Sequence, residues 1–240
     1  MPPNADFSRP EPRLLEEQAG WLAPARARLL RRAGIARRRR VLDLACGSGA
    51  VTGELARRCG GQVLALDRSL EALQEGAAAF AGAVRLCADA RRLPLADAAF
   101  DLVFCQFALV WLDVPAVLAE IYRVLTPGGV LLAIEPDYGG LIEHPPEITA
   151  RELWLAALQR AGADPQVGRK LPGLLAAAGF RVEVDLLDRL ESPAAARWQL
   201  LGGLPLTADE QQTLTQIEQA DAAAAHRVAH LPLFLLTAEK

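Results

Sequence analysis

Hydrophobic residues between residues 35 and 137 occur in short runs that are separated by longer, more polar stretches. The runs are rich in valine, leucine and alanine and lie at 41–45, 63–67, 84–88, 100–105 and 130–134. Runs of this length between turn residues are typical of strands buried on both faces. Three of the intervening stretches predict helices, to about residue 58, at 69–80 and at 115–125. This alternation predicts a doubly wound parallel α/β sheet with right-handed crossovers.

Helical patterns flank this region on both sides. A helix is expected over about 14–33, divided by Pro24 and ended by Gly34. After residue 137 the pattern predicts helices at about 145–161, 169–178, 193–201 and 208–229, and strands at 180–184 and 231–237. We therefore divide the chain into an N-terminal helical cap, 1–34, and a main domain, 35–240, with helical inserts at about 139–162 and 188–230.

The first predicted strand enters the glycine-rich turn Cys46-Gly47-Ser48-Gly49, and a helix follows. Glycines let a ligand approach the backbone, and the free amides at a helix start attract a carboxylate or phosphate. Asp67 ends the second strand, where its carboxylate can accept hydrogen bonds from both ribose hydroxyls of an adenosine. The alternative for Asp67 is a surface acid near a helix. The order of strand, turn, helix and strand favours the ribose role.

Further motifs follow in the same region: Val41-Leu42-Asp43-Leu44-Ala45 before the turn, Ala88-Asp89-Ala90, Phe100-Asp101-Leu102-Val103, and Tyr122-Arg123-Val124-Leu125-Thr126-Pro127-Gly128-Gly129. On these residues the chain resembles the class I S-adenosylmethionine-dependent methyltransferases, in particular the ubiquinone/menaquinone-type methyltransferase 11 group. Agreement is weaker from about residue 137 through Phe180, and Ala45 stands where the family commonly has glycine. The resemblance implies a Rossmann-like sheet of seven strands, mostly parallel with an antiparallel last strand, and helical lid insertions.

The resemblance also implies a cofactor, S-adenosylmethionine, with S-adenosylhomocysteine as product. The residues implied to bind it are Asp43, Ala45, Cys46, Gly47, Ser48, Gly49, Asp67, Arg68, Asp89, Ala90, Gln106 and Phe107. Asp43 would lie near the amino group of the cofactor, through water. Asp89 and Ala90 would meet the adenine, and Gln106 and Phe107 would lie beside the sulfonium. Asp101 is interpreted as a structural acid.

A methyl acceptor is expected beyond the carboxyl ends of the strands, next to the loop after the fifth strand. The candidate catalytic residues are Glu135, Asp137, Tyr138 and His144, and the candidate substrate-binding residues are Trp111, Glu135, Tyr138 and His144. Each has a structural alternative, such as a turn acid, a loop histidine or a core aromatic ring. In-line transfer from an activated donor needs a general base only if the nucleophile arrives protonated, so the catalytic group stays open.

A lid is expected over the acceptor. The sixth strand should be parallel to the others, so both inserts begin on the cofactor side, where the N-terminal helix also lies in this family. Candidate lid residues are Leu153, Trp154, Leu200, Leu201 and Leu204. We therefore expect a small, largely apolar acceptor.

Composition limits the other possibilities. Hydrophobic residues make up 52% of the chain, enough for a substantial core, and the net charge of −3 gives no general attraction to nucleic acid. The four scattered cysteines and the absence of a Cys/His cluster predict no metal site. His226 and His230, placed four apart on the expected helix, make a weak metal pair. With no signal segment and no apolar run of about 20 residues, a cytoplasmic location without a membrane span is expected.

Three other functions remain open. An NAD(P)-dependent oxidoreductase could use the same glycines and Asp67, although neither tyrosine has a lysine four residues later. A nucleic-acid methyltransferase would carry an Asn-Pro-Pro-Tyr type of motif after the fourth strand, where this chain has Cys105-Gln106-Phe107-Ala108. The third is a non-catalytic module that binds S-adenosylmethionine. The sequence leaves the oligomeric state open.

Overall fold

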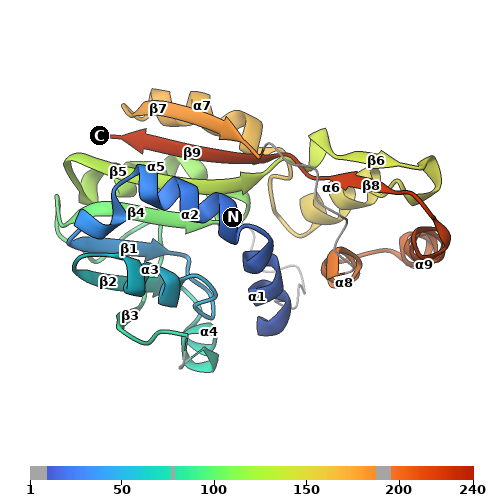
Figure 1. Cartoon of the computed structure of the whole chain (residues 1–240), viewed down its shortest axis with the longest axis horizontal. Helices are drawn as coiled ribbons and strands as arrows, with labels where there is room; N and C mark the ends of the chain where they lie inside the picture. The colour runs from blue at the N-terminus through green and yellow to red at the C-terminus, as the bar shows by residue number, and fades with distance from the viewer. Residues whose placement is uncertain (1–9, 77–78, 188–195) are drawn as a thin grey trace.

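A computed structural model describes residues 10–76, 79–187 and 196–240. Within this part of the chain a seven-stranded sheet has the order β3-β2-β1-β4-β5-β9-β7 (Figure 1). Its strands are β1 (Arg40–Leu44), β2 (Gln62–Asp67), β3 (Ala83–Cys87), β4 (Phe100–Gln106), β5 (Leu125–Pro136), β7 (Arg181–Leu186) and β9 (Leu233–Glu239). The pairs among β1 to β5 are parallel, and β9 is antiparallel to both of its neighbours. The predicted seven-stranded sheet with one antiparallel strand is confirmed.

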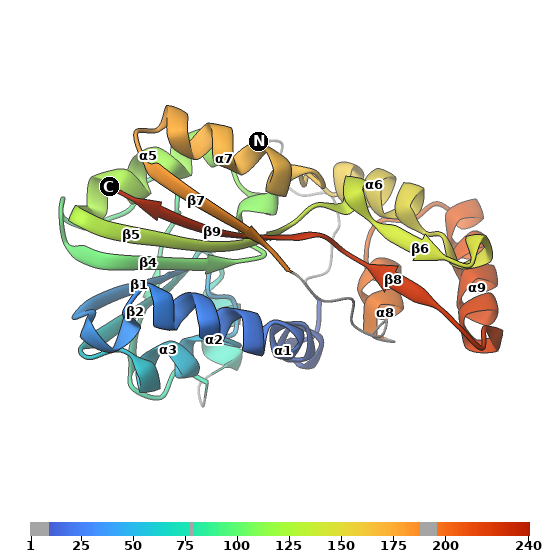
Figure 2. The same ribbon diagram turned by 45° about the horizontal axis from the view of Figure 1, so that its top comes forward.

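Helices cover both faces of the sheet (Figure 2). One face carries α1 (Pro12–Trp21), α2 (Ala23–Arg32) and α3 (Thr52–Arg58), and the other carries α5 (Val114–Val124) and α7 (Val167–Ala177). Leucines from both layers, such as Leu30, Leu55 and Leu118, are almost fully buried against the strands. The short helix α4 (Leu70–Glu75) follows β2, and single turns η1 (Ile35–Arg37) and η2 (Leu109–Trp111) precede β1 and follow β4.

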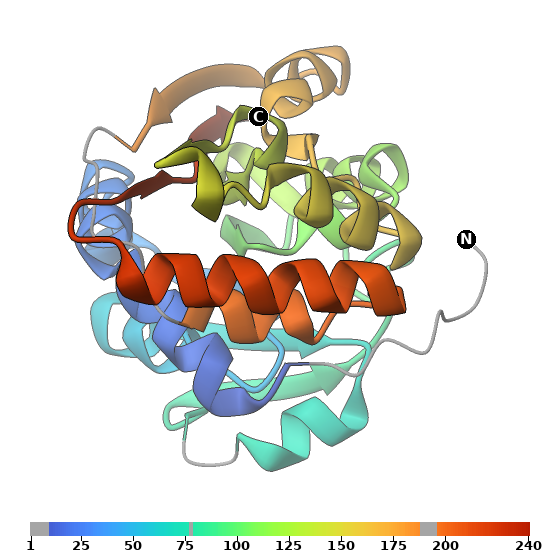
Figure 3. The same cartoon turned by 90° about the vertical axis from the view of Figure 1, so that its right-hand side faces the viewer.

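A second helical layer stands beyond the end of the sheet at which β5 finishes (Figures 1 and 3). It contains η3 (Tyr138–Gly140), η4 (Pro146–Ile148), α6 (Arg151–Arg160), α8 (Ala196–Gly202) and α9 (Ala208–Ala223). Strands β6 (Ile142–His144) and β8 (Val228–His230) pair there as a separate antiparallel ribbon. Because β6 follows β5 and β8 precedes β9, the ribbon continues these two neighbouring strands out of the main sheet.

Local signals explain where several helices begin. Pro24 stands in the first turn of α2, which divides the expected N-terminal helix into α1 and α2. The Ser69 hydroxyl accepts a hydrogen bond from the Ala72 amide at the start of α4, as its position in the sequence predicts. Thr207 and Glu210 form a complete capping box at the start of α9. These helix starts are set by side chains of the immediate sequence.

Three expected boundaries were wrong. The helix expected over 208–229 ends at Ala223, so His226 and His230 do not share a helix; the pairing of β8 with β6 takes the following residues into a strand. The helix expected to start at 145 begins at Arg151, where the Glu143 carboxylate accepts hydrogen bonds from the Ala150 and Arg151 amides. The helix expected to reach residue 80 ends at Glu75. The first two differences arise from tertiary partners, which no local pattern encodes.

The Asp101 carboxylate accepts hydrogen bonds from the Arg39 amide at 2.7 Å and the Arg40 amide at 3.2 Å. The Arg38 guanidinium also donates to the Asp101 carbonyl. These contacts join the start of β1 to the start of β4, at the end of the sheet opposite the glycine-rich turn. The structural interpretation of Asp101 is confirmed.

Candidate functional site

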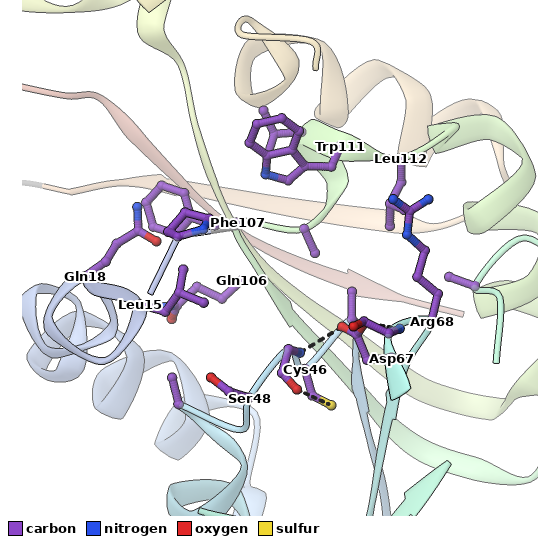
Figure 4. Close-up of a pocket in the computed structure, with 18 of the residues that line it drawn as sticks. Leu15, Gln18, Cys46, Ser48, Asp67, Arg68, Gln106, Phe107, Trp111 and Leu112 are labelled. Carbon is purple, nitrogen blue, oxygen red and sulfur yellow. Dashed lines mark hydrogen bonds between the residues drawn. The ribbon is translucent and has the colours of Figure 1, made fainter. Parts of the chain in front are cut away.

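A cavity of about 770 Å³ opens at the carboxyl ends of β1, β2 and β4 (Figure 4). The turn after β1, the end of β2 and the segments after β3 and β4 form one end of it. The other end is lined by residues of α1, η2, α6 and α8, together with Tyr138. This volume lies within the range of ordinary ligand pockets, about 300–1,000 Å³. The cavity therefore has one end made of strand termini and one end made of helices.

The turn after β1 contains residues in the left-handed backbone conformation. Ala45, Gly47 and Gly49 have φ angles of 55°, 56° and 86°. A side chain on Gly47 would meet nothing within 4 Å, whereas one on Gly49 would come within 2.9 Å of the Phe80 ring. Gly47 thus presents bare backbone to the cavity and Gly49 allows close packing behind it. The positive φ of Ala45 explains physically why glycine suits this position.

Asp67 joins the two strands at this turn. Its Oδ2 accepts a hydrogen bond from the Gly47 amide and its Oδ1 accepts one from the Ser69 amide, each at 2.8 Å. An ionised carboxylate offers about four acceptor positions, so both oxygens keep capacity for one further donor each. A vicinal diol is the donor pair that suits this arrangement. The residues present therefore fit the ribose of an adenosine cofactor, with Arg68 next to it on the cavity wall.

Asp43 lies behind the turn, almost fully buried, and its Oδ2 accepts a hydrogen bond from the Thr52 hydroxyl at 2.6 Å. Burial raises the pKa of the Asp43 carboxyl to about 7, although the bond from Thr52 opposes the shift. A cation brought into the cavity would favour the ionised form of this acid. Asp43 is thus suited to face the ammonium group of an amino acid, directly or through water. Cys46 and Ser48 complete this wall.

Asp89 and Ala90 follow β3, the neighbour of β2, and also line the cavity. The Arg91 side chain donates to both carboxylate oxygens of Asp89 and lowers the pKa of this acid to about 2. Asp89 is therefore ionised at any physiological pH and available as an acceptor, while the buried Ala90 gives a flat apolar surface. This combination suits the amino group and face of an adenine.

Gln106 ends β4 and Phe107 follows it with a φ angle of 52°. Both line the cavity between its two ends (Figure 4). The Phe107 amide donates to the Ile134 carbonyl, which continues the pairing of β4 with β5 through this strained position. The sequence placed both residues just past the fourth strand, and in the structure both line the cavity; their place beside the sulfonium stays a prediction.

The structure keeps three predicted residues away from the cavity wall. Glu135 is fully buried and accepts hydrogen bonds from the amides of Ala108, Leu109 and Val110, so it organises the loop after β4. Asp137 pairs with Arg169 and accepts a bond from the Gly139 amide. His144 is exposed in β6, paired with β8. Neither the two carboxylates nor the imidazole lines the cavity, so a role for them in catalysis stays a prediction.

Tyr138 and Trp111 do line the cavity, at its helical end. The Tyr138 ring stacks on Trp154 of α6, with centroids 4.8 Å apart and an angle of 28° between the rings. Burial raises the pKa of the Tyr138 phenol, so this group stays protonated and can donate but not remove a proton. Leu158, Leu200 and Leu204 add aliphatic surface. This end is suited to an apolar molecule with few charges.

Several lining residues carried no recognisable signal in the sequence. Gln18 of α1 and Arg160 of α6 reach the cavity from helices that the sequence describes only as amphipathic. Arg26 does not line the cavity but bonds to Gln106, which does. Helical periodicity identifies buried faces and gives no information on which cavity a face borders. Of the leucines and tryptophan chosen for the lid, Trp154, Leu200 and Leu204 line the cavity, while Leu153 and Leu201 pack beside it.

Neither metal nor membrane features are found in the described ranges. No cluster of three or more His, Cys, Asp or Glu side chains could hold a metal ion there. No helix in the same ranges is long and apolar enough to cross a lipid bilayer.

The fold and the site together define a Rossmann-like α/β protein with a pocket whose residues suit an adenosine-containing cofactor. Residues 42–133 match the family model described as a methyltransferase domain. The chain is 34% identical over 145 residues to a malonyl-[acyl-carrier protein] O-methyltransferase of Hamiltonella defensa, a match that covers 60% of this chain and 52% of that protein. The chain thus spans about half the length of this curated relative.

Solved structures share the fold across nearly the whole chain. An S-adenosylmethionine-dependent methyltransferase from Mesorhizobium loti superimposes with a TM-score of 0.57 at 22% identity, covering 91% of this chain and 97% of that one. A phosphoethanolamine N-methyltransferase of Haemonchus contortus, solved with S-adenosylhomocysteine, gives 0.62 at 18% identity over 91% of this chain and 52% of that one. Residues 42–133 therefore match a methyltransferase domain, and the similarity to these solved structures shows that the chain shares their fold. The predicted resemblance to a methyltransferase family is confirmed over these residues.

Proposed function

We propose that this protein transfers a methyl group from S-adenosylmethionine to a small, largely apolar acceptor enclosed between α1, α6 and α8. The observation that carries the proposal is the single cavity wall that joins the Gly47 turn and Asp67 to Trp111, Tyr138 and Trp154. A cofactor and an acceptor placed in one continuous cavity can meet in line at Gln106 and Phe107. Proximity and orientation of this kind lower a barrier by roughly 7–11 kcal/mol.

The cofactor, when bound, supplies a methyl group that its sulfonium charge has already activated. The chain then has to orient the cofactor and the acceptor and to enclose them. In this proposal Asp67 fixes the ribose, Asp89 and Ala90 fix the adenine, and the aromatic rings of Trp111 and Tyr138 orient the acceptor. Exclusion of water by the helical end strengthens the electrostatic interactions inside the cavity.

The lid in this proposal consists of the N-terminal cap, 1–34, and the inserts at about 139–162 and 188–230. Support comes from the cavity-lining residues Leu15 and Gln18 of α1, Trp154 and Leu158 of α6, and Leu200 and Leu204 of α8. The part of the second insert at 188–195 and residues 1–9 lie outside the described residues.

A second candidate specifies the acceptor as a carboxylate at the end of an acyl chain, carried on an acyl-carrier protein. It draws on the name of the Hamiltonella relative and on the chemistry of the cavity. Among the described residues at the helical end no histidine lines the cavity, and Tyr138 stays protonated. An acceptor that is already ionised needs no base, and a carboxylate meets this condition.

Two measurements test the proposal. Addition of S-adenosylhomocysteine should raise the melting temperature of the protein and addition of NADH should not, because only a ligand of the native state stabilises it. Transfer of radiolabelled methyl should then be followed with small phenols, quinols, amines and carboxylates, and separately with a malonyl thioester on a carrier protein. Stabilisation by NADH alone would overturn the proposal in favour of an oxidoreductase. Binding of S-adenosylhomocysteine without transfer to any acceptor would favour a non-catalytic binding module.

A further inference from the structure

Arg26 of α2 is a buried cation close to the cavity, with only 4% of its side chain exposed. Its Nε and Nη2 donate to Glu54 Oε2 at 2.8 and 2.6 Å. Its Nη1 donates to the Ala19 carbonyl of α1 at 2.8 Å and to Gln106 Oε1 at 3.0 Å. One guanidinium therefore connects the N-terminal cap, helix α3 and the end of β4. The sequence motifs of the cofactor site do not include it.

This contact determines which end of the Gln106 amide faces the cavity. A guanidinium can only donate hydrogen bonds, so it holds the amide oxygen of Gln106 and leaves Nε2 with two hydrogens on the other side. Among the described residues none accepts a hydrogen bond from that Nε2. Because Gln106 lines the cavity, its amide is presented there as a donor. Without Arg26 the amide could turn and present its oxygen instead.

A guanidinium lies directly behind this donor. Glu54 is shared between two cations, since its Oε1 lies 2.9 Å from Arg58 Nε, and the three side chains together carry one positive charge. Asp43 on the neighbouring strand β1 pairs with Phe104, two residues before Gln106. An acidic side chain and a hydrogen-bond donor with a guanidinium behind it thus lie near the ends of two adjacent strands. This pattern is complementary to a molecule that carries an ammonium and a carboxylate on one carbon.

We propose that Arg26 is a positioning residue that fixes the Gln106 amide so that Nε2 donates to the α-carboxylate of the methionine part of the cofactor. Asp43 then serves the α-ammonium group of the same moiety. The inference rests on the proposed function, because it requires the cofactor in this cavity. It goes further by assigning the amino-acid end of the cofactor to a residue of the N-terminal cap, through a side chain of β4.

The test compares two ligands that differ only in this moiety. S-adenosylhomocysteine carries the amino acid, whereas 5′-methylthioadenosine keeps the adenosine and the thioether but lacks the ammonium and the carboxylate. Binding of each is measured by isothermal titration calorimetry, which needs no acceptor. If neither ligand binds the wild-type protein, the proposed function fails and this inference fails with it. If both bind, the variants below decide the inference alone.

Gln106→Glu is the main variant, since a glutamate still accepts hydrogen bonds from Arg26 and so keeps the cap attached. It removes the donor and puts an anion opposite the carboxylate. We expect S-adenosylhomocysteine to bind at least about tenfold more weakly, while the affinity for 5′-methylthioadenosine stays within about twofold. Gln211→Glu on the exposed face of α9 is the control for added charge and should change neither affinity.

The pair Arg26→Met with Glu54→Gln tests the positioning role and avoids leaving one buried charge without its partner. This double change should weaken the binding of S-adenosylhomocysteine several-fold and leave the binding of 5′-methylthioadenosine unchanged. Added to Gln106→Leu, the pair should cause no further loss, because Arg26 acts through Gln106. Equal weakening of both ligands would assign these residues a purely structural role, and an unchanged affinity for S-adenosylhomocysteine in Gln106→Glu would place the carboxylate elsewhere; either result overturns the inference.

Discussion

The two ends of the cavity are built in different ways. The end proposed for the cofactor is formed by strand termini and the turns that follow them, and the residues that line it include Gly47, Asp67 and Asp89. The helical end is formed by side chains from α1, α6 and α8, which come from separate parts of the chain. Residues at strand termini take up their relative positions as soon as the sheet has formed. A site held by packed helices depends on how those helices meet.

The largest effect that tests this comparison is expected for Asp67→Ala. The change removes the proposed ribose acceptor and also the bonds that hold the Gly47 and Ser69 amides. Loss of two hydrogen bonds to a charged group corresponds to about 100-fold or more in affinity for S-adenosylmethionine. Calorimetric titration measures it.

Asp97→Ala is the matched control for this change, because Asp97 is a largely exposed acid that pairs with Arg123 away from the cavity. It should bind S-adenosylmethionine as the wild type does. An Asp67→Ala protein that keeps the wild-type affinity would remove the basis for assigning the strand termini to the cofactor.

A smaller effect separates backbone strain from ligand contact at the turn. Gly47 and Gly128 have φ angles of 56° and 72°, and a side chain on either would meet nothing within 4 Å. Alanine at each should therefore lower the free energy of unfolding by a similar amount, about 1–2 kcal/mol. Only Gly47→Ala puts a methyl group where we expect the cofactor to approach the backbone. This variant alone should therefore lower the affinity for S-adenosylhomocysteine, by about tenfold.

Urea unfolding and calorimetric titration of both variants measure these two quantities. Equal affinities in Gly47→Ala and Gly128→Ala would show that the bare backbone of the turn makes no close contact with the ligand.

The same division explains what the sequence could predict. The strands, the turn and Asp67 follow from alternation and glycine placement within 41–67, and the structure places them as expected. Glu135 was predicted on position alone, since a residue after a strand can point to either side; only packing turns its carboxylate toward the amides of 108–110. Arg26 illustrates the opposite case. It lies among several arginines of an amphipathic helix, and nothing local distinguishes the one that becomes buried.

The loop between the two ends should respond to pH through Glu135. Burial raises the pKa of this carboxyl to about 7 from an ordinary value of 4.5. The native state therefore holds the proton more tightly than the unfolded chain, and this stabilising contribution is complete below about pH 4.5 and is lost as the pH rises through about 7. In Glu135→Gln the contribution cannot titrate. The stability of the variant relative to the wild type should thus improve as the pH rises from about 5 to 7.

Urea unfolding at several pH values measures this difference, with Glu120→Gln as control, because the Arg123 side chain lowers the pKa of Glu120. A lowered pKa gives the opposite sign: the relative stability of Glu120→Gln should fall as the pH rises through the carboxyl range. Parallel curves for the two variants would contradict the assignment of a raised pKa to Glu135.

The smallest effect is expected where two helices of the proposed lid are joined at the surface. Arg160 of α6 lines the cavity, and its guanidinium donates to both carboxylate oxygens of Glu210 at the start of α9, at 3.0 and 2.9 Å. Arg160→Gln should change the free energy of unfolding by about 1 kcal/mol or less, because the pair is partly exposed to solvent at the surface. Lys170→Gln, which removes the exposed pair with Asp164, is the matched control.

Limited proteolysis distinguishes the two variants although their stabilities are similar. If the lid opens by separation of α9 from α6, Arg160→Gln should increase cleavage within 196–223 relative to Lys170→Gln, because local opening depends on the contacts that join the moving parts. Saturation with S-adenosylhomocysteine should leave this difference in place, since the cofactor occupies the strand termini and makes no demand on α9. Equal cleavage in both variants, or protection of α9 by the cofactor alone, would mean that the helical end is fixed as firmly as the sheet, and the contrast between the two ends would not hold.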